Sequence, residues 1–157
     1  MNIESLNQLI NGSDIRGIAV DTDEYEANLS VKEVRKLASG FLQLLKRDKK
    51  IDRRPLRIAI GFDSRISGPA IKESLVECFL EAGVVVLDAD LATTPAMFMA
   101  TQFPEIDADA GIMITASHLP YFYNGLKFFT KDGGAEHEDM EKIVEYADIK
   151  IEGQEKG

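Results

Sequence analysis

Residues 110–130, AGIMITASHLPYFYNGLKFFT, contain two apolar runs joined by a polar segment, and this arrangement decides how the chain folds. The run AGIMIT at 110–115 has the composition of a buried strand, and GLKFFT at 125–130 predicts a further strand. The connection between them is too short for a crossover helix, so we expect the two strands to pair antiparallel. We place the second strand at an edge of the sheet, closed by the turn KDGG.

The segments upstream and downstream alternate between strand and helix patterns. Ser30 and Glu33 form a capping-box pattern at the start of the helix expected at 30–46. This alternation predicts an α/β fold, a three-layer sandwich whose mixed, mostly parallel sheet of about four strands is flanked by helices. The other expected strands are 13–20, 57–62 and 84–89, and the other helices are 69–82, a short one starting near Pro95, and 136–147.

Length, charge and cysteine content limit the classes of function. The 157 residues fit one domain. The formal net charge of −9 argues against nucleic acid as the main partner, because phosphate backbones need a basic surface, whereas a small phosphorylated substrate needs only a local positive pocket. No stretch approaches the roughly 20 apolar residues of a membrane span, so we expect no membrane partner. The single cysteine, Cys78, cannot form an internal disulfide; we expect it to be buried, and a reducing cytoplasm as the location.

The polar segment between the two apolar runs is the candidate site. It leaves the C-terminal end of the 110–115 strand, the edge at which open α/β sheets bind ligands. A serine there, Ser117, in a loop fixed by Pro120 and Gly125, can present its hydroxyl to a cleft. The same residue types also build ordinary turns, so the composition alone allows a structural loop. A hydrolase pair with His118 is excluded, because adjacent side chains point apart and no G-x-S-x-G motif is present.

T-A-S-H-x-P followed by Y-N-G-x-K resembles the active-site loop of the α-D-phosphohexomutases, the phosphoglucomutase and phosphomannomutase superfamily. Three further segments agree in order, and the resemblance covers about residues 12–145. One position departs from the family pattern, because Leu119 stands where the family usually has Asn. The further segments are Gly12-Ser13-Asp14-Ile15-Arg16-Gly17, Gly61-Phe62-Asp63-Ser64-Arg65 with Ser67-Gly68, and Thr94-Pro95.

The resemblance implies a role for each residue of this pattern. Ser117 would be the nucleophile that carries the phosphoryl group, and its phosphorylated oxygen would also bind Mg²⁺ together with aspartates of a D-G-D-G-D segment in a second domain, absent here. Lys127 would be the general acid/base; the alternative is an exposed strand lysine. Arg16 would stabilise phosphoryl charge together with His118, and its alternative is a surface ion pair. Thr115, Asn124 and Gly125 would bind substrate, and Asp63 and Arg65 would support the loop.

Three pairs of aspartates with one residue between them could be mistaken for the metal ligands. They lack the glycines and the third carboxylate of the family's metal segment, so we expect solvated loop acids. The pairs are Asp21 with Asp23, Asp88 with Asp90, and Asp107 with Asp109.

The function implied is that of domain I, at residues 1–150, of a mutase that interconverts hexose 1-phosphate and hexose 6-phosphate through a phosphoserine and a bisphosphate. Residues 151–157 would be a polar tail or the start of a linker to a second domain. Thr115 favours glucose or mannose phosphate, because the glucosamine-phosphate branch typically has Ser there. The alternatives are a phosphoglucosamine or phosphoacetylglucosamine mutase domain, and a non-catalytic sugar-phosphate-binding module. The expected partners are a hexose phosphate and the rest of the parent chain, without which the domain would be inactive.

Overall fold

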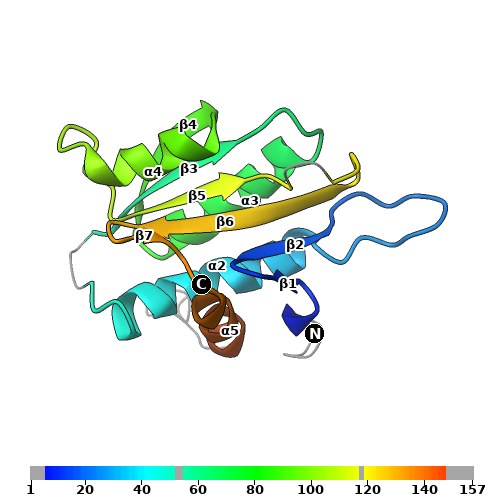
Figure 1. Ribbon diagram of the computed structural model, residues 1–157, viewed down its shortest axis with the longest axis horizontal. Coiled ribbons are helices and arrows are strands. Elements are labelled where there is room, and N and C mark those ends of the chain that lie inside the picture. Colours follow the sequence, from blue (N-terminus) through cyan, green and yellow to red (C-terminus); the bar gives the residue numbers. More distant parts are fainter. Residues whose placement is uncertain (1–5, 52–54, 117–118, 148–157) are drawn as a thin grey trace.

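A mixed seven-stranded sheet lies between two layers of helices (Figure 1). The computed structural model describes residues 6–51, 55–116 and 119–147. The three-layer α/β architecture predicted from the sequence is confirmed. The strands are β1 (Ile10–Asn11), β2 (Asp14–Ile18), β3 (Arg57–Phe62), β4 (Val85–Leu91), β5 (Ala110–Ile114), β6 (Tyr123–Thr130) and β7 (Gly133–Gly134). The helices are α2 (Val31–Arg47), α3 (Gly68–Glu81), α4 (Thr94–Gln102) and α5 (His137–Tyr146).

The sheet has more strands than expected, and most of its pairings are antiparallel. The strand order is β1-β2-β6-β5-β3-β4, with β7 paired to β6. In the described residues β3 pairs parallel with β4 and with β5, whereas the other four pairings are antiparallel. The expectation of about four, mostly parallel strands was therefore wrong. β1 and β7 have two residues each, too few to show a periodicity.

Strand β6 lies inside the sheet, between β2 and β5, so its expected place at an edge was wrong. Its antiparallel pairing with β5 is confirmed, and β2 pairs along its other side, with Ile15 opposite Leu126. Lys127 lies in the middle of this strand. In the structure it projects from a face of the sheet, since its neighbours Leu126 and Phe128 both point into the core on the opposite face.

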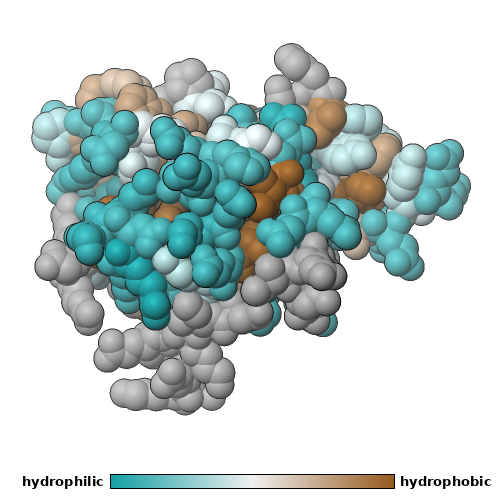
Figure 2. Space-filling view, turned by 60° about the horizontal axis from the view of Figure 1, so that its bottom comes forward, coloured by the Kyte–Doolittle hydropathy of each residue, from teal (hydrophilic) through white to brown (hydrophobic). Residues whose placement is uncertain are grey.

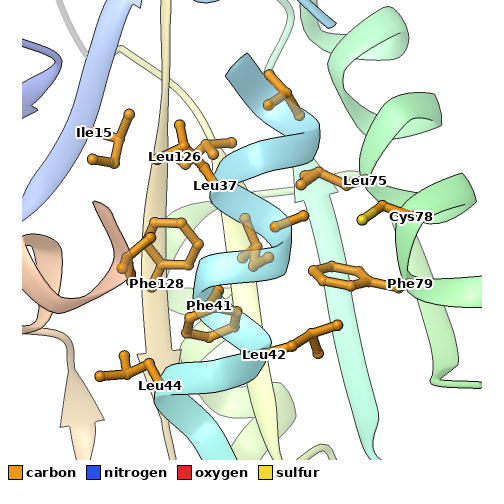
Figure 3. Packing of buried hydrophobic residues seen from close by; sticks show 14 of the residues in the cluster. Ile15, Leu37, Phe41, Leu42, Leu44, Leu75, Cys78, Phe79, Leu126 and Phe128 are labelled. Atoms are coloured by element: carbon orange, nitrogen blue, oxygen red, sulfur yellow. The ribbon is translucent and has the colours of Figure 1, made fainter. Parts of the chain in front are cut away.

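Helices α2, α3 and α5 cover one face of the sheet and enclose the main core (Figures 1 and 3). Phe41 of α2 packs against Phe128 of β6, with ring centroids 4.5 Å apart, and Cys78 of α3 is buried as expected. The capping box of Ser30 and Glu33 is present at the start of α2, as predicted. Seen from the side of these helices, the described surface is mainly hydrophilic, with a smaller hydrophobic area (Figure 2). No helix in the described part of the chain is long and apolar enough to span a membrane.

Helix α4 covers the opposite face over β3 and β5 and encloses a smaller core. Ala59 of β3 and Met113 of β5 pack there against Met97 of the helix. Asp14, Arg16 and Lys127 project from the same face of the sheet, since Ile15 and Leu126 beside them point into the main core. The arrangement of the strands therefore separates an apolar part of this face, under α4, from a charged part on β2 and β6.

Candidate active site

The candidate loop leaves the C-terminal end of β5, at the edge where the sequence predicted it. Ser117 and His118 lie outside the described residues, so the structure shows the flanks of the loop and the elements that hold them. These flanks are residues 115–116 and 119–127.

Asp63 holds the N-terminal flank of the loop. The Thr115 hydroxyl donates a hydrogen bond of 2.6 Å to Oδ2 of Asp63, which follows β3 directly. The other carboxylate oxygen accepts a 3.2 Å hydrogen bond from the backbone N–H of Arg65. Because β3 and β5 are parallel neighbours, their C-terminal ends meet at the same sheet edge, where the two loops come into contact.

Arg65 holds the C-terminal flank through the backbone. Its guanidinium donates to the carbonyl oxygens of Leu119 and Pro120, both at 2.7 Å, and of Tyr123 at 3.0 Å. Hydrogen bonds with a charged donor are stronger than neutral ones, so this one side chain strongly restrains the five residues 119–123. All three acceptors are main-chain groups, and Leu119 in place of the family's Asn therefore leaves these bonds intact.

Asn124 and Gly125 lie beneath the loop. Asn124 is 0% exposed, its Nδ2 donates to Oγ of Ser67 at 2.8 Å, and its Oδ1 accepts from the N–H of Gly125 at 2.9 Å. A side chain at Gly125 would collide with the carbonyl oxygens of Ile15 and Thr115, so glycine is what allows β2, β6 and the loop to approach closely. Sequence reasoning assigned no role to Ser67, although it lies in the quoted Ser67-Gly68 pair.

Arg16 and Lys127 converge on one carboxylate. Oδ2 of Asp14 lies 3.0 Å from Nε of Arg16 and 3.1 Å from Nζ of Lys127. The Arg16 and Lys127 side chains are 22% and 29% exposed, against 8% for Asp14. Lys127 is thus neither fully exposed nor free of partners, and Arg16 forms an ion pair with a buried carboxylate. Sequence reasoning missed Asp14, whose signal was its place in the D-I-R-G segment.

The strand pairings bring the basic pair close to the flanks of the loop. Arg16 lies opposite Gly125 in the β2–β6 register, and the carbonyl of Gly125 accepts a 3.0 Å hydrogen bond from the N–H of Thr115. The pairing of β2 with β6, more than 100 residues apart in the sequence, thus places Arg16 in the same region of the sheet as Thr115 and Lys127. This region has two cationic groups next to a hydroxyl-bearing loop, an arrangement that suits a phosphorylated ligand.

An aromatic contact fixes the far end of the loop. The rings of Tyr25 and Phe122 stack with centroids 5.8 Å apart, and the carbonyl of Phe122 accepts hydrogen bonds from the N–H groups of Ala19 at 2.8 Å and Val20 at 3.3 Å. The connection between β2 and α2 therefore packs against the candidate loop. Sequence reasoning gave no indication of this contact.

The aspartate pairs expected to be solvated loop acids lie in different environments, and Asp88 and Asp90 belong to strand β4 rather than to a loop. Among the residues that the structure describes, no three His, Cys, Asp or Glu side chains are close enough to hold an ion together. Asp88 and Asp107 pair with Lys72 and Lys131 at 2.9 and 3.0 Å. Asp109 differs from the expectation of a solvated acid, because it is buried and its Oδ2 accepts a 2.9 Å hydrogen bond from the N–H of Arg57.

Comparisons with known proteins identify the family of this chain and support its fold. Residues 7–153 match the family model described as phosphoglucomutase/phosphomannomutase, alpha/beta/alpha domain I. The chain is 36% identical over 131 residues to a phosphoglucosamine mutase of Leuconostoc citreum, and 37% identical over 131 residues to a phosphoglucomutase/phosphomannomutase of Thermococcus kodakarensis. Each alignment covers 83% of this chain and about a quarter of the relative, 27% and 26% respectively.

The solved structures support the same fold. The crystal structure of a phosphoglucomutase/phosphomannomutase family protein from Burkholderia thailandensis superposes with a TM-score of 0.72, at 21% identity, over 94% of this chain and 30% of that one. The family match covers nearly all of the described residues, including every flank of the candidate loop. The chain therefore belongs to the phosphoglucomutase/phosphomannomutase family, as its N-terminal α/β/α domain I.

Proposed function

We propose that this chain is domain I of a phosphohexomutase, which interconverts hexose 1-phosphate and hexose 6-phosphate through a phosphoserine at Ser117 and a bisphosphate intermediate. One observation carries the proposal. Both flanks of the Ser117 loop are held from the β3 loop, by Asp63 and Arg65, while β2 and β6 bring Arg16 and Lys127 to the same region. Phosphoryl transfer needs this combination, because it depends on positioning and on positive charge near the transferred group.

The proposed reaction has two phosphoryl transfers that balance. In the first, a sugar hydroxyl oxygen attacks phosphorus, the bond between phosphorus and Ser117 Oγ breaks, the hydroxyl proton leaves and Oγ takes a proton. In the second, Oγ gives up its proton and attacks the other phosphate, the bond from phosphorus to the sugar oxygen breaks, and that oxygen takes a proton. We assign the movement of these protons to Lys127, and the stabilisation of phosphoryl charge to Arg16 and His118.

The remaining site residues are proposed to shape the loop. Asp63 and Arg65 fix its flanks, as their hydrogen bonds support. Thr115, Asn124 and Gly125 are all buried and their polar groups have partners inside the protein, so we propose that they act on substrate through the shape of the loop. This is narrower than the direct substrate contact that the resemblance implies.

Membership of the family is the only support for Mg²⁺ as the cofactor. Ser117 would supply one phosphoserine oxygen, and a single such ligand does not make a site for an ion that prefers six oxygen ligands, some of them waters. The described residues hold no further cluster of ligands. They do not fit a complete metal site by themselves, and we assign the aspartate ligands to a second domain of the longer protein.

The candidate substrates fall into two groups, glucose or mannose phosphate and glucosamine or N-acetylglucosamine phosphate. Thr115 favours glucose or mannose phosphate, and the Thermococcus kodakarensis relative is named a phosphoglucomutase/phosphomannomutase. Glucosamine phosphate is the second candidate, because the similarly distant Leuconostoc citreum relative is named a phosphoglucosamine mutase. The chain spans about a quarter of these relatives, so we assign turnover to a longer cytoplasmic protein. In it, residues 1–150 would form domain I and 151–157 the beginning of a linker.

The deciding experiment uses the full-length protein, purified from a host that lacks its own hexose phosphate mutases. Turnover of glucose, mannose, glucosamine and N-acetylglucosamine 1-phosphates is followed by ³¹P NMR, and the phosphorylated residue is mapped by peptide mass spectrometry. We expect turnover of at least one sugar, one phosphate on Ser117, and loss of both in Ser117→Ala. No turnover of any sugar would favour the non-catalytic binding module, and a phosphate on another residue would overturn the assignment of Ser117.

A further inference from the structure

We propose that Asp14 is a positioning residue for the phosphoryl transfer, because its carboxylate holds the Lys127 ammonium and the Arg16 guanidinium at one place on the sheet. The effect of Asp14 on turnover presupposes the proposed function. The contact itself is a property of the fold and is tested separately below.

The geometry places one oxygen atom between two cations. Oδ2 of Asp14 lies 3.0 Å from Nε of Arg16 and 3.1 Å from Nζ of Lys127. Each cation is about 3 Å from the shared oxygen, so the two are at most about 6 Å apart and repel each other. The carboxylate offsets this repulsion, and without it both flexible side chains are free to separate into solvent.

The backbone of Asp14, rather than its side chain, takes part in the sheet. Its backbone pairs with Asn11 in the β1–β2 ladder, and the neighbouring Ile15 anchors β2 in the main core. Within the described residues the carboxylate contacts the two proposed catalytic cations. A substitution that keeps the shape of the side chain and removes its charge therefore alters the placement of the cations much more than the fold.

The variant is Asp14→Asn in the full-length protein, and the matched control is Asp109→Asn. Asp109 is equally buried, at 5% exposure for both residues, but it lies at the opposite end of β5 and accepts from the backbone of Arg57. We expect Asp14→Asn to lower kcat about 10–100-fold, which is a part of the rate that a positioned acid/base contributes. The KM should stay within about threefold of the wild-type value. The Asp109→Asn control should have the same kcat per folded molecule as the wild-type protein. A kcat for Asp14→Asn within about twofold of wild type would overturn the proposal.

A double-mutant cycle separates positioning from an independent role. If Asp14 acts through Lys127, then adding Asp14→Asn to Lys127→Met should lower kcat by a much smaller factor than it does in the wild-type background. The same cycle is run with Arg16→Met. The full factor in both the Lys127→Met and the Arg16→Met backgrounds would show that Asp14 acts through neither cation, and the proposal would be wrong.

A second measurement requires no turnover. Reductive methylation of the full-length protein, mapped by peptide mass spectrometry, reports how readily the Lys127 amine reacts. We expect Asp14→Asn to increase the methylation rate of Lys127 several-fold, and Asp109→Asn to leave it unchanged. If the wild-type protein turns over no sugar phosphate, the proposed function fails, while this measurement still tests the contact. An unchanged methylation rate would show that Asp14 does not hold Lys127.

Discussion

The restraint that Arg65 places on the candidate loop leads to a quantitative prediction. In Arg65→Met the three hydrogen bonds to the carbonyls of Leu119, Pro120 and Tyr123 are lost, while a side chain of similar length remains to fill the space. The loop keeps its own backbone bonds, from the N–H of Leu119 to Ala116 and from the N–H of Tyr123 to Pro120. These two amides therefore report how often the loop opens.

The magnitude follows from the environment of the three bonds. A hydrogen bond with a charged partner contributes about 1.5–3 kcal/mol net, but water partly replaces the lost donors because Pro120 is exposed, so we take about 1 kcal/mol for each. The free energy of opening the loop should then fall by about 3 kcal/mol, which corresponds to roughly 100-fold faster amide exchange. Global stability should fall by less, since the opened loop is only a small part of the fold.

The assay is hydrogen–deuterium exchange of the full-length protein, resolved to the amides of Leu119 and Tyr123. Arg57→Met is the matched control, because the Arg57 guanidinium also donates to two backbone carbonyls, of Ile106 and Asp107, at the other end of the sheet. The control should accelerate exchange around residues 106–107 and leave the loop unchanged. Wild-type exchange rates at Leu119 and Tyr123 in Arg65→Met would refute the claim that Arg65 restrains this loop.

Four further predictions concern Lys127, Gly125, Tyr146 and the isolated chain. Lys127→Met in the full-length enzyme should lower kcat by roughly 10²–10⁴-fold with an unchanged circular dichroism spectrum. A decrease in kcat below about threefold would show that Lys127 is not the general acid/base. Gly125→Ala should lower the free energy of unfolding in urea by about 2–4 kcal/mol, because its Cβ collides with two backbone carbonyls; an unchanged midpoint would contradict this packing. The hydrogen bond that the Tyr146 hydroxyl donates to Asp48 raises the pKa of Tyr146. The stabilisation that this bond gives the folded state is therefore present below about pH 10, and it is lost as the pH rises through the folded-state pKa of Tyr146. The difference in melting temperature between wild type and Tyr146→Phe should therefore shrink above that pH, and a constant difference would argue against the bond. The isolated 157-residue chain should unfold cooperatively but show no mutase turnover in a coupled assay; turnover within about tenfold of the full-length protein would place the whole active site in this domain.

The amino-acid sequence by itself determined the local elements. RIAIGF predicted β3 with the bounds that the structure has, and the capping box at Ser30 and Glu33 marked the start of α2. The short connection between β5 and β6 predicted their antiparallel pairing. Each of these features depends on residues near one another in the chain, whose periodicity, capping and turn length are set by local backbone geometry. The family motif likewise located the candidate loop, because its residues are contiguous.

Tertiary structure alone decided the position of β6 and the contacts around the loop. Nothing local in GLKFFT shows that β2, more than 100 residues earlier in the chain, pairs along its free side. The contacts of Asp14 with Lys127, of Ser67 with Asn124 and of Arg65 with the loop carbonyls all depend on that pairing or on the packing of β3 beside β5. Partners so far apart in the sequence share no periodicity or spacing, so only the folded chain brings them together.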